Sequence, residues 1–192
     1  MSALDKAHRL LAPRIAYLIG TRASDHSPNL IPVSNLTSIS TQPQQIAIAV
    51  YKQWETHKNL RNTEGFTVSA PHICQLEGVW KLGAKYSRYL YANNADKIAA
   101  SGFSIDHDMS LYGPVVTDGL GWAVCQTIAK LDFDGDHSLF VARIEQVYFN
   151  PTYLNSNGTP RSDARPVMQI TGNTFTTAAD AHTIPYYKQS TT

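Results

Sequence analysis

The sequence predicts a mainly β protein with helical insertions, arranged as an antiparallel barrel. Many short β-leaning runs follow one another, and helical segments interrupt them without regular alternation. The two longest runs, Gly121–Phe133 and Ser138–Phe149, are joined by Asp134-Gly135-Asp136, and Asp-Gly between such runs is a strong hairpin signal. A doubly wound parallel sheet is disfavoured because strands and helices do not alternate throughout, and no GxGxxG motif occurs.

The first half of the chain is expected to supply a short helix, four strands and a second helix. Asp5–Leu11 has amphipathic spacing and is ended by Pro13. Strands are expected at 15–21, 29–33, 36–40 and 46–50, where apolar or alternating residues are separated by turn formers. Thr56 is expected to be the N-cap of a helix over His57–Asn62.

The second half is expected to continue this pattern. A strand is predicted at 66–69, and a helix at 73–82, where apolar residues recur at helical spacing. A polar, aromatic-rich segment follows at 85–94, and then a short helix at 96–101 that ends at Gly102. After the long hairpin, 152–165 is rich in turn formers, 166–170 is a last short strand, and the tail beyond Ala178 is expected to be loosely held.

Length and composition favour one domain spanning 1–192, with its core at about 14–175. The formal net charge is +1, so no strong field favours nucleic acid. The N-terminal nine residues are charged and no run of ~20 apolar residues occurs, so we expect no leader peptide, no membrane span and a cytoplasmic location. Cys74 and Cys125 lie outside any CxxC pattern and are predicted to be reduced, buried thiols.

One segment has the composition of an anion site. Hydroxyl side chains crowd a predicted strand and its turn at Asn35–Thr41, and Thr56 is followed by His57, Lys58 and Asn59 in the first helical turn, with Lys52 just before. Hydroxyl donors and a helix N-terminus are what a phosphate group requires. The alternative is the polar face of a surface strand beside an ordinary helix cap.

Several other motifs fail on inspection. The run from Asp132 resembles a calcium loop, but its sixth position is His137 instead of Gly and its twelfth is Arg143 instead of Glu, so a β-turn is expected. No HExxH or GxSxG motif occurs, so neither a metal site nor a hydrolase is predicted. Basic residues are scattered through the middle of the chain and are expected to form a solvated face, with contact to a nucleotide phosphate as the alternative: Arg61, Lys81, Lys85, Arg88 and Lys97.

Over about 14–175 the ordered motifs resemble the flavin reductase-like family of FMN-binding split barrels, which includes flavoredoxins and the reductase components of two-component monooxygenases. The segment N-L-I-P-V-S at Asn29, with S-T-Q-P at Ser40, is similar to the family's flavin segment, although one Pro stands where two are frequent. T-H-K-N-L at Thr56 and G-D-H-S-L-F-V at Gly135 resemble its helix start and its hairpin. D-K-I at Asp96 and the stretch from Arg165 to Phe175 resemble its later helix and closing strand.

The resemblance implies an antiparallel split β-barrel of Greek-key type that binds FMN. It implies that His137 lies near the flavin and nicotinamide, as a candidate catalytic residue. By motif position it also implies a set of cofactor-binding residues: Asn35, Leu36, Thr37, Ser38, Ser40, Thr41, Lys52, Thr56, His57 and Asn59.

The implied function is an NAD(P)H:flavin reductase that transfers hydride from NADH or NADPH to FMN, working as a homodimer, with a monooxygenase or an electron carrier as a further partner. One alternative is an electron-transfer flavoprotein of the flavoredoxin or ferric reductase kind, and another is a flavin-binding module without turnover. The preference between NADH and NADPH stays open. So does the substrate, because Trp80–Asn94 departs most from the family pattern.

Overall fold

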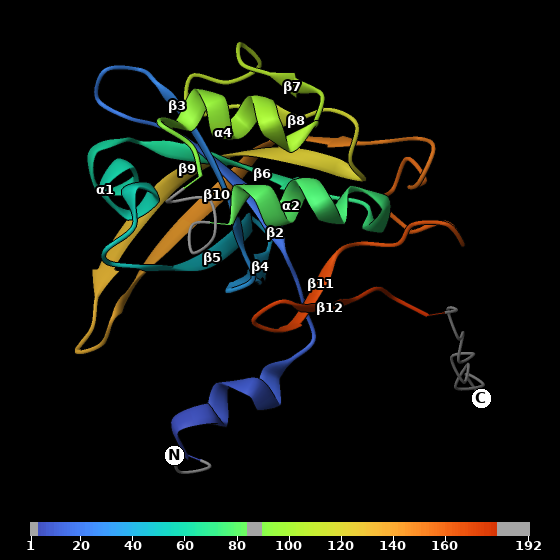
Figure 1. The fold of residues 1–192 in the computed structure, drawn as a ribbon, viewed down its shortest axis with the longest axis horizontal. Coiled ribbons are helices and arrows are strands. Elements are labelled where there is room, and N and C mark those ends of the chain that lie inside the picture. Colours follow the sequence, from blue (N-terminus) through green and yellow to red (C-terminus); the bar gives the residue numbers. More distant parts are fainter. Residues whose placement is uncertain (1–3, 84–89, 180–192) are drawn as a thin grey trace, which may run out of the picture.

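The centre of the protein is one antiparallel sheet of seven strands. The computed structural model describes residues 4–83 and 90–179. The strands of this sheet are β2 (Tyr17–Arg22), β3 (Pro28–Val33), β4 (Leu36–Thr41), β5 (Gln44–Tyr51), β6 (Gly65–Ala70), β9 (Gly121–Asp132) and β10 (His137–Phe149). Their spatial order is β3-β2-β6-β9-β10-β5-β4 (Figure 1), so β3 and β4, which follow each other in the chain, form the two edges.

The sheet curls around one apolar core, to which all seven strands contribute. Ile31 from one edge strand and Leu36 from the other meet Phe66 and Phe140 from the middle of the sheet. Helix α1 (Glu55–Asn62) adds Leu60 to the same core. The edges β3 and β4 have no ladder between them in the described part of the chain, so the barrel is split there. This is the predicted antiparallel split barrel.

A second core lies on the outer face of β2 and β3. Leu18 and Leu30 point into it, while their neighbours Ile19 and Ile31 point into the barrel, as expected because successive side chains of a strand alternate between faces. Helices α2 (Leu76–Leu82) and α4 (Asn94–Ser101) cover this face, as Figure 1 shows. Gly102 ends α4 with φ 76°, a left-handed conformation that glycine adopts without a Cβ clash.

Short elements complete the fold. A three-stranded sheet joins β1 (Arg14–Ile15), β11 (Met168–Thr171) and β12 (Thr174–Thr176), and a two-stranded one joins β7 (Ile105–Asp106) and β8 (Val115–Val116). The 3-10 helix η2 (Ile73–Gln75) leads into α2. The 3-10 helix η1 (Leu4–Leu11) stands away from the body in Figure 1, and none of its residues is buried.

Most predicted elements are confirmed, but one strand was predicted wrongly and three strands were missed. The β9–β10 hairpin forms with Ser138 opposite Asp132. The single strand expected at 15–21 is wrong: β1 and β2 belong to different sheets, because the Ala16 amide bonds to the Val167 carbonyl instead of continuing the ladder. The strands β7, β8 and β12 were not predicted from periodicity, since two or three residues show no period. Cys125 is buried as predicted, whereas Cys74 is exposed.

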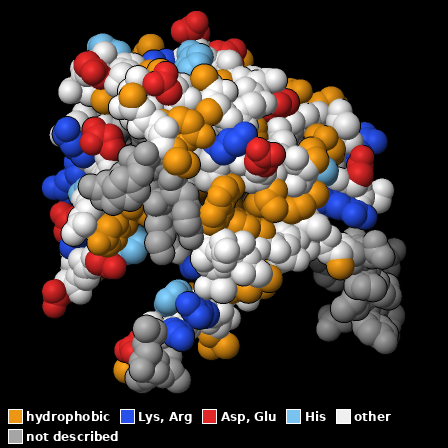
Figure 2. All heavy atoms as spheres, in the orientation of Figure 1, with side chains coloured by type: hydrophobic (Ala, Val, Ile, Leu, Met, Phe, Trp, Pro, Cys, Tyr) orange, Lys and Arg blue, Asp and Glu red, His pale blue; other side chains and the backbone are white. Residues whose placement is uncertain are grey.

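On the face in Figure 2, basic and acidic side chains are interspersed among polar and hydrophobic ones, in keeping with the net charge of +1.

Among residues 4–83 and 90–179, no helix has the length and apolar character needed to cross a bilayer.

Candidate functional site

Two cavities lie side by side and share the indole of Trp54. The smaller has a volume of about 240 Å³ and lies beside the split between the barrel edges. The larger has a volume of about 1270 Å³ and lies between the start of α1 and the start of α4. Trp54 immediately precedes α1 and is a lining residue of both cavities.

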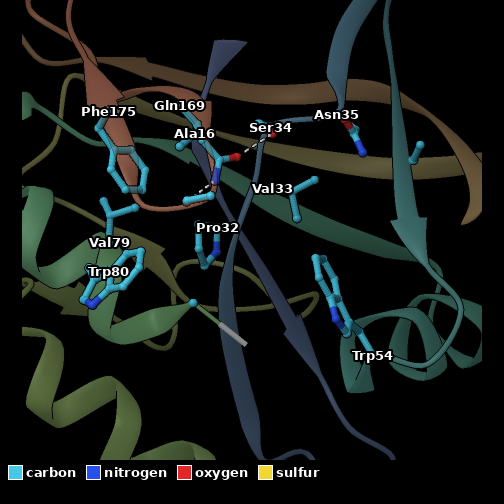
Figure 3. Close-up of a pocket in the computed structure, with 13 residues that line it drawn as sticks. Ala16, Pro32, Val33, Ser34, Asn35, Trp54, Val79, Trp80, Gln169 and Phe175 are labelled. Carbon is cyan, nitrogen blue, oxygen red and sulfur yellow. Dashed lines mark hydrogen bonds between the residues drawn. The ribbon is translucent and has the colours of Figure 1, made fainter. Parts of the chain in front are cut away.

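The smaller cavity has an aromatic wall and a polar edge (Figure 3). Trp54, Trp80 and Phe175 supply the wall, and the Trp80 and Phe175 rings meet edge to face at 6.0 Å. The polar edge comes from Ser34, Asn35 and Gln169, and the Ser34 hydroxyl donates to Gln169 Oε1 at 3.1 Å. The Asn35 main-chain carbonyl accepts from the Ala49 amide at 2.9 Å, which fixes the corner between β3 and β4. This cavity suits a flat ring system with polar groups along one side.

The larger cavity is bordered by a buried polar network. Lys97 Nζ donates to Asn29 Oδ1 at 3.1 Å, and Asn29 Nδ2 donates to Thr56 Oγ1 at 2.7 Å. Thr21 Oγ1, deeper in the barrel, accepts from Asn29 Nδ2 at 3.4 Å and from Asn59 Nδ2 at 3.0 Å. Each of these five residues is buried. The network therefore presents one cation and one hydroxyl to the cavity from a fixed support.

Lys97 is the electrostatic centre of this network. Its side chain is only 6% exposed, and burial lowers its pKa to about 8 from the ordinary 10.5. Within the described residues no carboxylate forms an ion pair with it. A buried ammonium without an acidic partner is costly, and an anion bound in the cavity would relieve that cost. The expectation that Lys97 belongs to a solvated face is therefore wrong.

The first turns of two helices also line the larger cavity. Glu55 and Thr56 come from α1, and Asn94 and Ala95 from α4. Both helix N-termini favour negative charge through their backbone N–H groups. Glu55 opposes this effect, although its carboxylate lies 3.6 Å from Lys58 Nζ. The positive features converge on the side of the cavity where Lys97 lies.

Thr56 does not cap α1. The N-cap is Trp54, and Thr56 lies inside the first turn with its hydroxyl bonded to Asn29. The prediction failed because Thr is a frequent N-cap, whereas here the hydroxyl is needed by the buried network. Thr56 still lines the larger cavity, and Asn59 lies behind it with only 2% of its surface exposed.

The predicted residues of 35–41 lie around one edge of the barrel. Asn35 lines the smaller cavity, and Leu36 packs against the barrel core. The others continue along β4, where they are exposed except for the half-buried Ser40: Thr37, Ser38, Ser40 and Thr41. Of this group only Asn35 is a cavity residue among the described contacts.

The three remaining predicted residues gather at the β9–β10 hairpin. Lys52 Nζ donates to the Phe133 carbonyl at 2.9 Å, and His57 Nε2 lies 2.8 Å from Ser138 Oγ. His137 Nδ1 lies 2.6 Å from Asp136 Oδ1.

His137 reaches the larger cavity only through Tyr51. The imidazole lies 5.5 Å from the Tyr51 ring, and Tyr51 lies 5.8 Å from Trp54. Tyr51 and Trp54 line the larger cavity, whereas His137 is not among its described lining residues. The catalytic role of His137 stays a prediction.

Sequence reasoning did not assign Asn29, Trp54 and Gln169 to a site, and it gave contact of Lys97 with a nucleotide phosphate only as an alternative. Asn29 and Lys97 stand within recognised motifs, yet they are 68 residues apart and nothing in their spacing shows that they meet. Gln169 comes to the cavity from a strand whose pairing with β1 is not encoded by any periodic pattern. The three-dimensional structure is needed to find these residues.

Two other features of the described residues bear on chemistry. No group of three His, Cys, Asp or Glu side chains in that part of the chain could hold a metal ion. The exposed Cys74 has its Sγ 3.0 Å from His72 Nδ1, but that same ring nitrogen also accepts from the Cys74 amide as the cap of η2. The pair lies outside both cavities.

Solved structures share this architecture. Nitrilotriacetate monooxygenase component B from Bacillus cereus superposes with a TM-score of 0.81 and 13% identity, covering 96% of this chain and 95% of that one. An FMN-binding protein from Thermus thermophilus, with bound 1-cyclohex-2-enone, gives 0.74 and 18% identity, with 91% of each chain covered. At these identities the similarity shows the fold.

Sequence comparison gives the family. An uncharacterised protein of Pyrococcus abyssi is 25% identical over 139 residues, which cover 72% of this chain and 76% of that protein. The model of the flavin reductase like domain matches residues 9–165, which is most of the chain. The chain therefore belongs to the flavin reductase-like domain family.

Proposed function

We propose that this protein is a flavin-dependent oxidoreductase that binds FMN across the two cavities and takes electrons from NADH or NADPH. The observation that carries the proposal is the buried Lys97, which has no acidic partner among the described residues, in a cavity that shares Trp54 with an aromatic-walled one. FMN has the same two parts, a phosphate and a flat ring system.

The residues of the larger cavity fit a phosphate. Lys97 Nζ has three N–H donors and uses one of them for Asn29. Thr56 Oγ1 accepts from Asn29, so its own hydroxyl hydrogen is available to donate. Charge-assisted hydrogen bonds of this kind are about twice as strong as neutral ones. Lys97 and Thr56 would therefore hold the phosphate, with Asn29 as their support.

The residues of the smaller cavity fit the ring. Trp54, Trp80 and Phe175 offer aromatic surfaces, and aromatic pairs are stabilised by stacked or edge-to-face contacts. Asn35 and Gln169 provide amide groups for the polar edge of the ring. Bound FMN would itself supply the hydride chemistry, while these side chains bind it, orient it and exclude water.

Family membership and the relatives support the proposal. The family description names flavin reductases, and the Thermus thermophilus relative is an FMN-binding protein. Component B of a monooxygenase is also among the relatives. A second protein that receives electrons, together with a homodimeric assembly and a cytoplasmic location, therefore remains part of the proposal.

Titration with FMN and an NAD(P)H assay test the function. FMN binding is measured by quenching of flavin fluorescence, and oxidation of NADH and NADPH at 340 nm, with and without added FMN. A protein that binds FMN and accelerates NAD(P)H oxidation supports the proposal. FMN binding without NAD(P)H oxidation would instead favour an electron carrier or a binding module, and no FMN binding would refute all three.

A further inference from the structure

A second cation that has no acidic partner among residues 4–83 and 90–179 lies beside the smaller cavity. Arg14 on β1 is partly buried and forms no ion pair with any described residue. Its Nη1 donates to Asn35 Oδ1 at 2.6 Å, while its Nε is buried and has no hydrogen-bond partner in the described part of the chain. An unsatisfied buried donor on a charged group is costly, so Arg14 needs an explanation beyond holding β1 in place.

The three-stranded sheet places Arg14 on the cavity side. Arg14 is directly opposite Gln169 in the β1–β11 ladder, and Gln169 is directly opposite Phe175 in the β11–β12 ladder. Residues directly opposite each other in antiparallel strands project from the same face. Gln169 and Phe175 both line the smaller cavity, as does Asn35, which Arg14 contacts. Arg14 therefore stands just behind the polar edge of that cavity (Figure 3 shows Asn35, Gln169 and Phe175).

The charge of Arg14 lies next to the polar edge of the smaller cavity, where the flavin ring would bind. The guanidinium carries one positive charge and is partly buried. A positive charge close to the ring has little effect on a neutral ring but favours a negative one. The ring of oxidised FMN is neutral. When NADH or NADPH gives up a hydride and becomes NAD⁺ or NADP⁺, the ring receives two electrons and one proton and carries one negative charge.

We propose that Arg14 stabilises the negative charge of the reduced flavin ring and so raises the reduction potential of the bound cofactor. This inference rests on the proposed function, since it requires FMN to bind with its ring in the smaller cavity. Arg14 is then a tuning residue for the cofactor, with Asn35 as the side chain that positions its guanidinium. Lys97, in contrast, faces a phosphate whose charge is the same in both oxidation states.

The experiment compares the affinity of the protein for oxidised FMN and for FMN reduced with dithionite under anaerobic conditions. Arg14→Gln should weaken binding of reduced FMN at least tenfold more than binding of oxidised FMN. Each tenfold difference lowers the two-electron midpoint potential by about 30 mV. Arg14→Lys keeps the charge and should retain most of the difference between the two oxidation states. Arg143→Gln, which removes the same charge from an exposed position on β10, should leave both affinities unchanged.

Two further measurements distinguish an effect on the charge of the reduced ring from a general loss of FMN binding. Lys97→Met should weaken both oxidation states by equal factors. In the wild-type protein, the absorbance spectrum of bound reduced FMN should remain that of the anion to lower pH than for free reduced FMN, and this needs no variant. Equal weakening of both states by Arg14→Gln, or titration of bound reduced FMN at the pH of the free molecule, would overturn the role of Arg14. Failure of the wild-type protein to bind FMN in either state would instead overturn the proposed function.

Discussion

Replacing Lys97 by Met should weaken FMN binding and at the same time stabilise the flavin-free protein. The two effects have opposite signs because Lys97 is placed for a ligand and not for the fold. Its ammonium is buried, has no acidic partner among the described residues and makes one hydrogen bond, to Asn29. Methionine fills a similar volume without a charge to bury.

The magnitudes follow from the burial and the pKa. Each unit of pKa shift corresponds to about 1.4 kcal/mol, so a drop from 10.5 to about 8 means that keeping Lys97 charged costs the fold about 3 kcal/mol. The variant recovers that cost but leaves the Asn29 amide oxygen without its donor, at about 1 kcal/mol. The expected net gain in unfolding free energy at pH 7 is about 2 kcal/mol. Loss of a charged hydrogen bond to the phosphate costs about 1.5–3 kcal/mol, or roughly ten- to hundredfold in Kd.

Urea unfolding without FMN measures the first effect, and titration with FMN measures the second. Lys6→Met is the matched control, because it removes the same charge from the exposed helix η1 and should change neither quantity. Riboflavin, which lacks the phosphate, should bind to wild type and Lys97→Met equally well. A variant that loses stability, or that binds FMN as tightly as wild type, would refute the assignment of Lys97 to a phosphate.

Four further outcomes are expected. The stability advantage of Lys97→Met should shrink as pH rises from about 8 to 10.5, because the unfolded wild-type chain binds more protons in that window; an advantage that is constant with pH would contradict a buried charge. Thr56→Val, which keeps the shape but removes the hydroxyl that Asn29 binds, should weaken FMN binding about tenfold in the same titration, and an unchanged Kd would contradict contact with the phosphate. Phe140→Ala should cost about 3–5 kcal/mol in urea unfolding, because this ring is fully buried in the barrel, and a loss below 1 kcal/mol would contradict the core assignment. A thiol titration of the folded protein with a disulfide reagent should show one fast thiol, Cys74, while Cys125 reacts only after unfolding; two fast thiols would contradict the burial of Cys125, which raises its pKa to about 12.

Local patterns in the sequence were enough to predict the barrel. The Asp-Gly turn determines the β9–β10 hairpin. Strand β4 was also predicted, although the alternation expected at 36–40 is interrupted by a register shift at Ile39, whose side chain is exposed. The end of α4 at Gly102 also follows from a local rule, because helices commonly end at a residue in the left-handed conformation and glycine adopts it most easily. Each of these features depends only on residues close together in the chain, so the local sequence is enough to predict it.

The site was predicted only in part, because its polar residues interact over long separations in the chain. Thr is a residue type that often caps helices, and the sequence does not show that Asn29 binds the Thr56 hydroxyl instead. Lysine is usually a surface residue, whereas Lys97 is buried because α4 packs over β3. Motif resemblance predicted that both segments of the chain lie near a flavin but did not show which side chains meet.

The arrangement of β3 explains why the cavities lie where they do. Along this strand Leu30 faces the helices, while Asn29, Ile31 and Val33 face the barrel, so Asn29 closes the barrel end beside the larger cavity, where α1 and α4 both contact β3. The chain then leaves the sheet at Ser34 and Asn35 and re-enters it as the opposite edge, and this departure creates the split beside the smaller cavity. Near its start, β3 supplies Asn29, which supports Lys97. Just after its end, the chain supplies Asn35, which binds Arg14 at the polar edge of the smaller cavity. A single insertion or deletion within 29–35 would turn either Asn29 or Asn35 to the opposite face of the sheet, because side chains alternate along a strand. The spacing between Asn29 and Asn35 is therefore a requirement of the site and not only of the sheet.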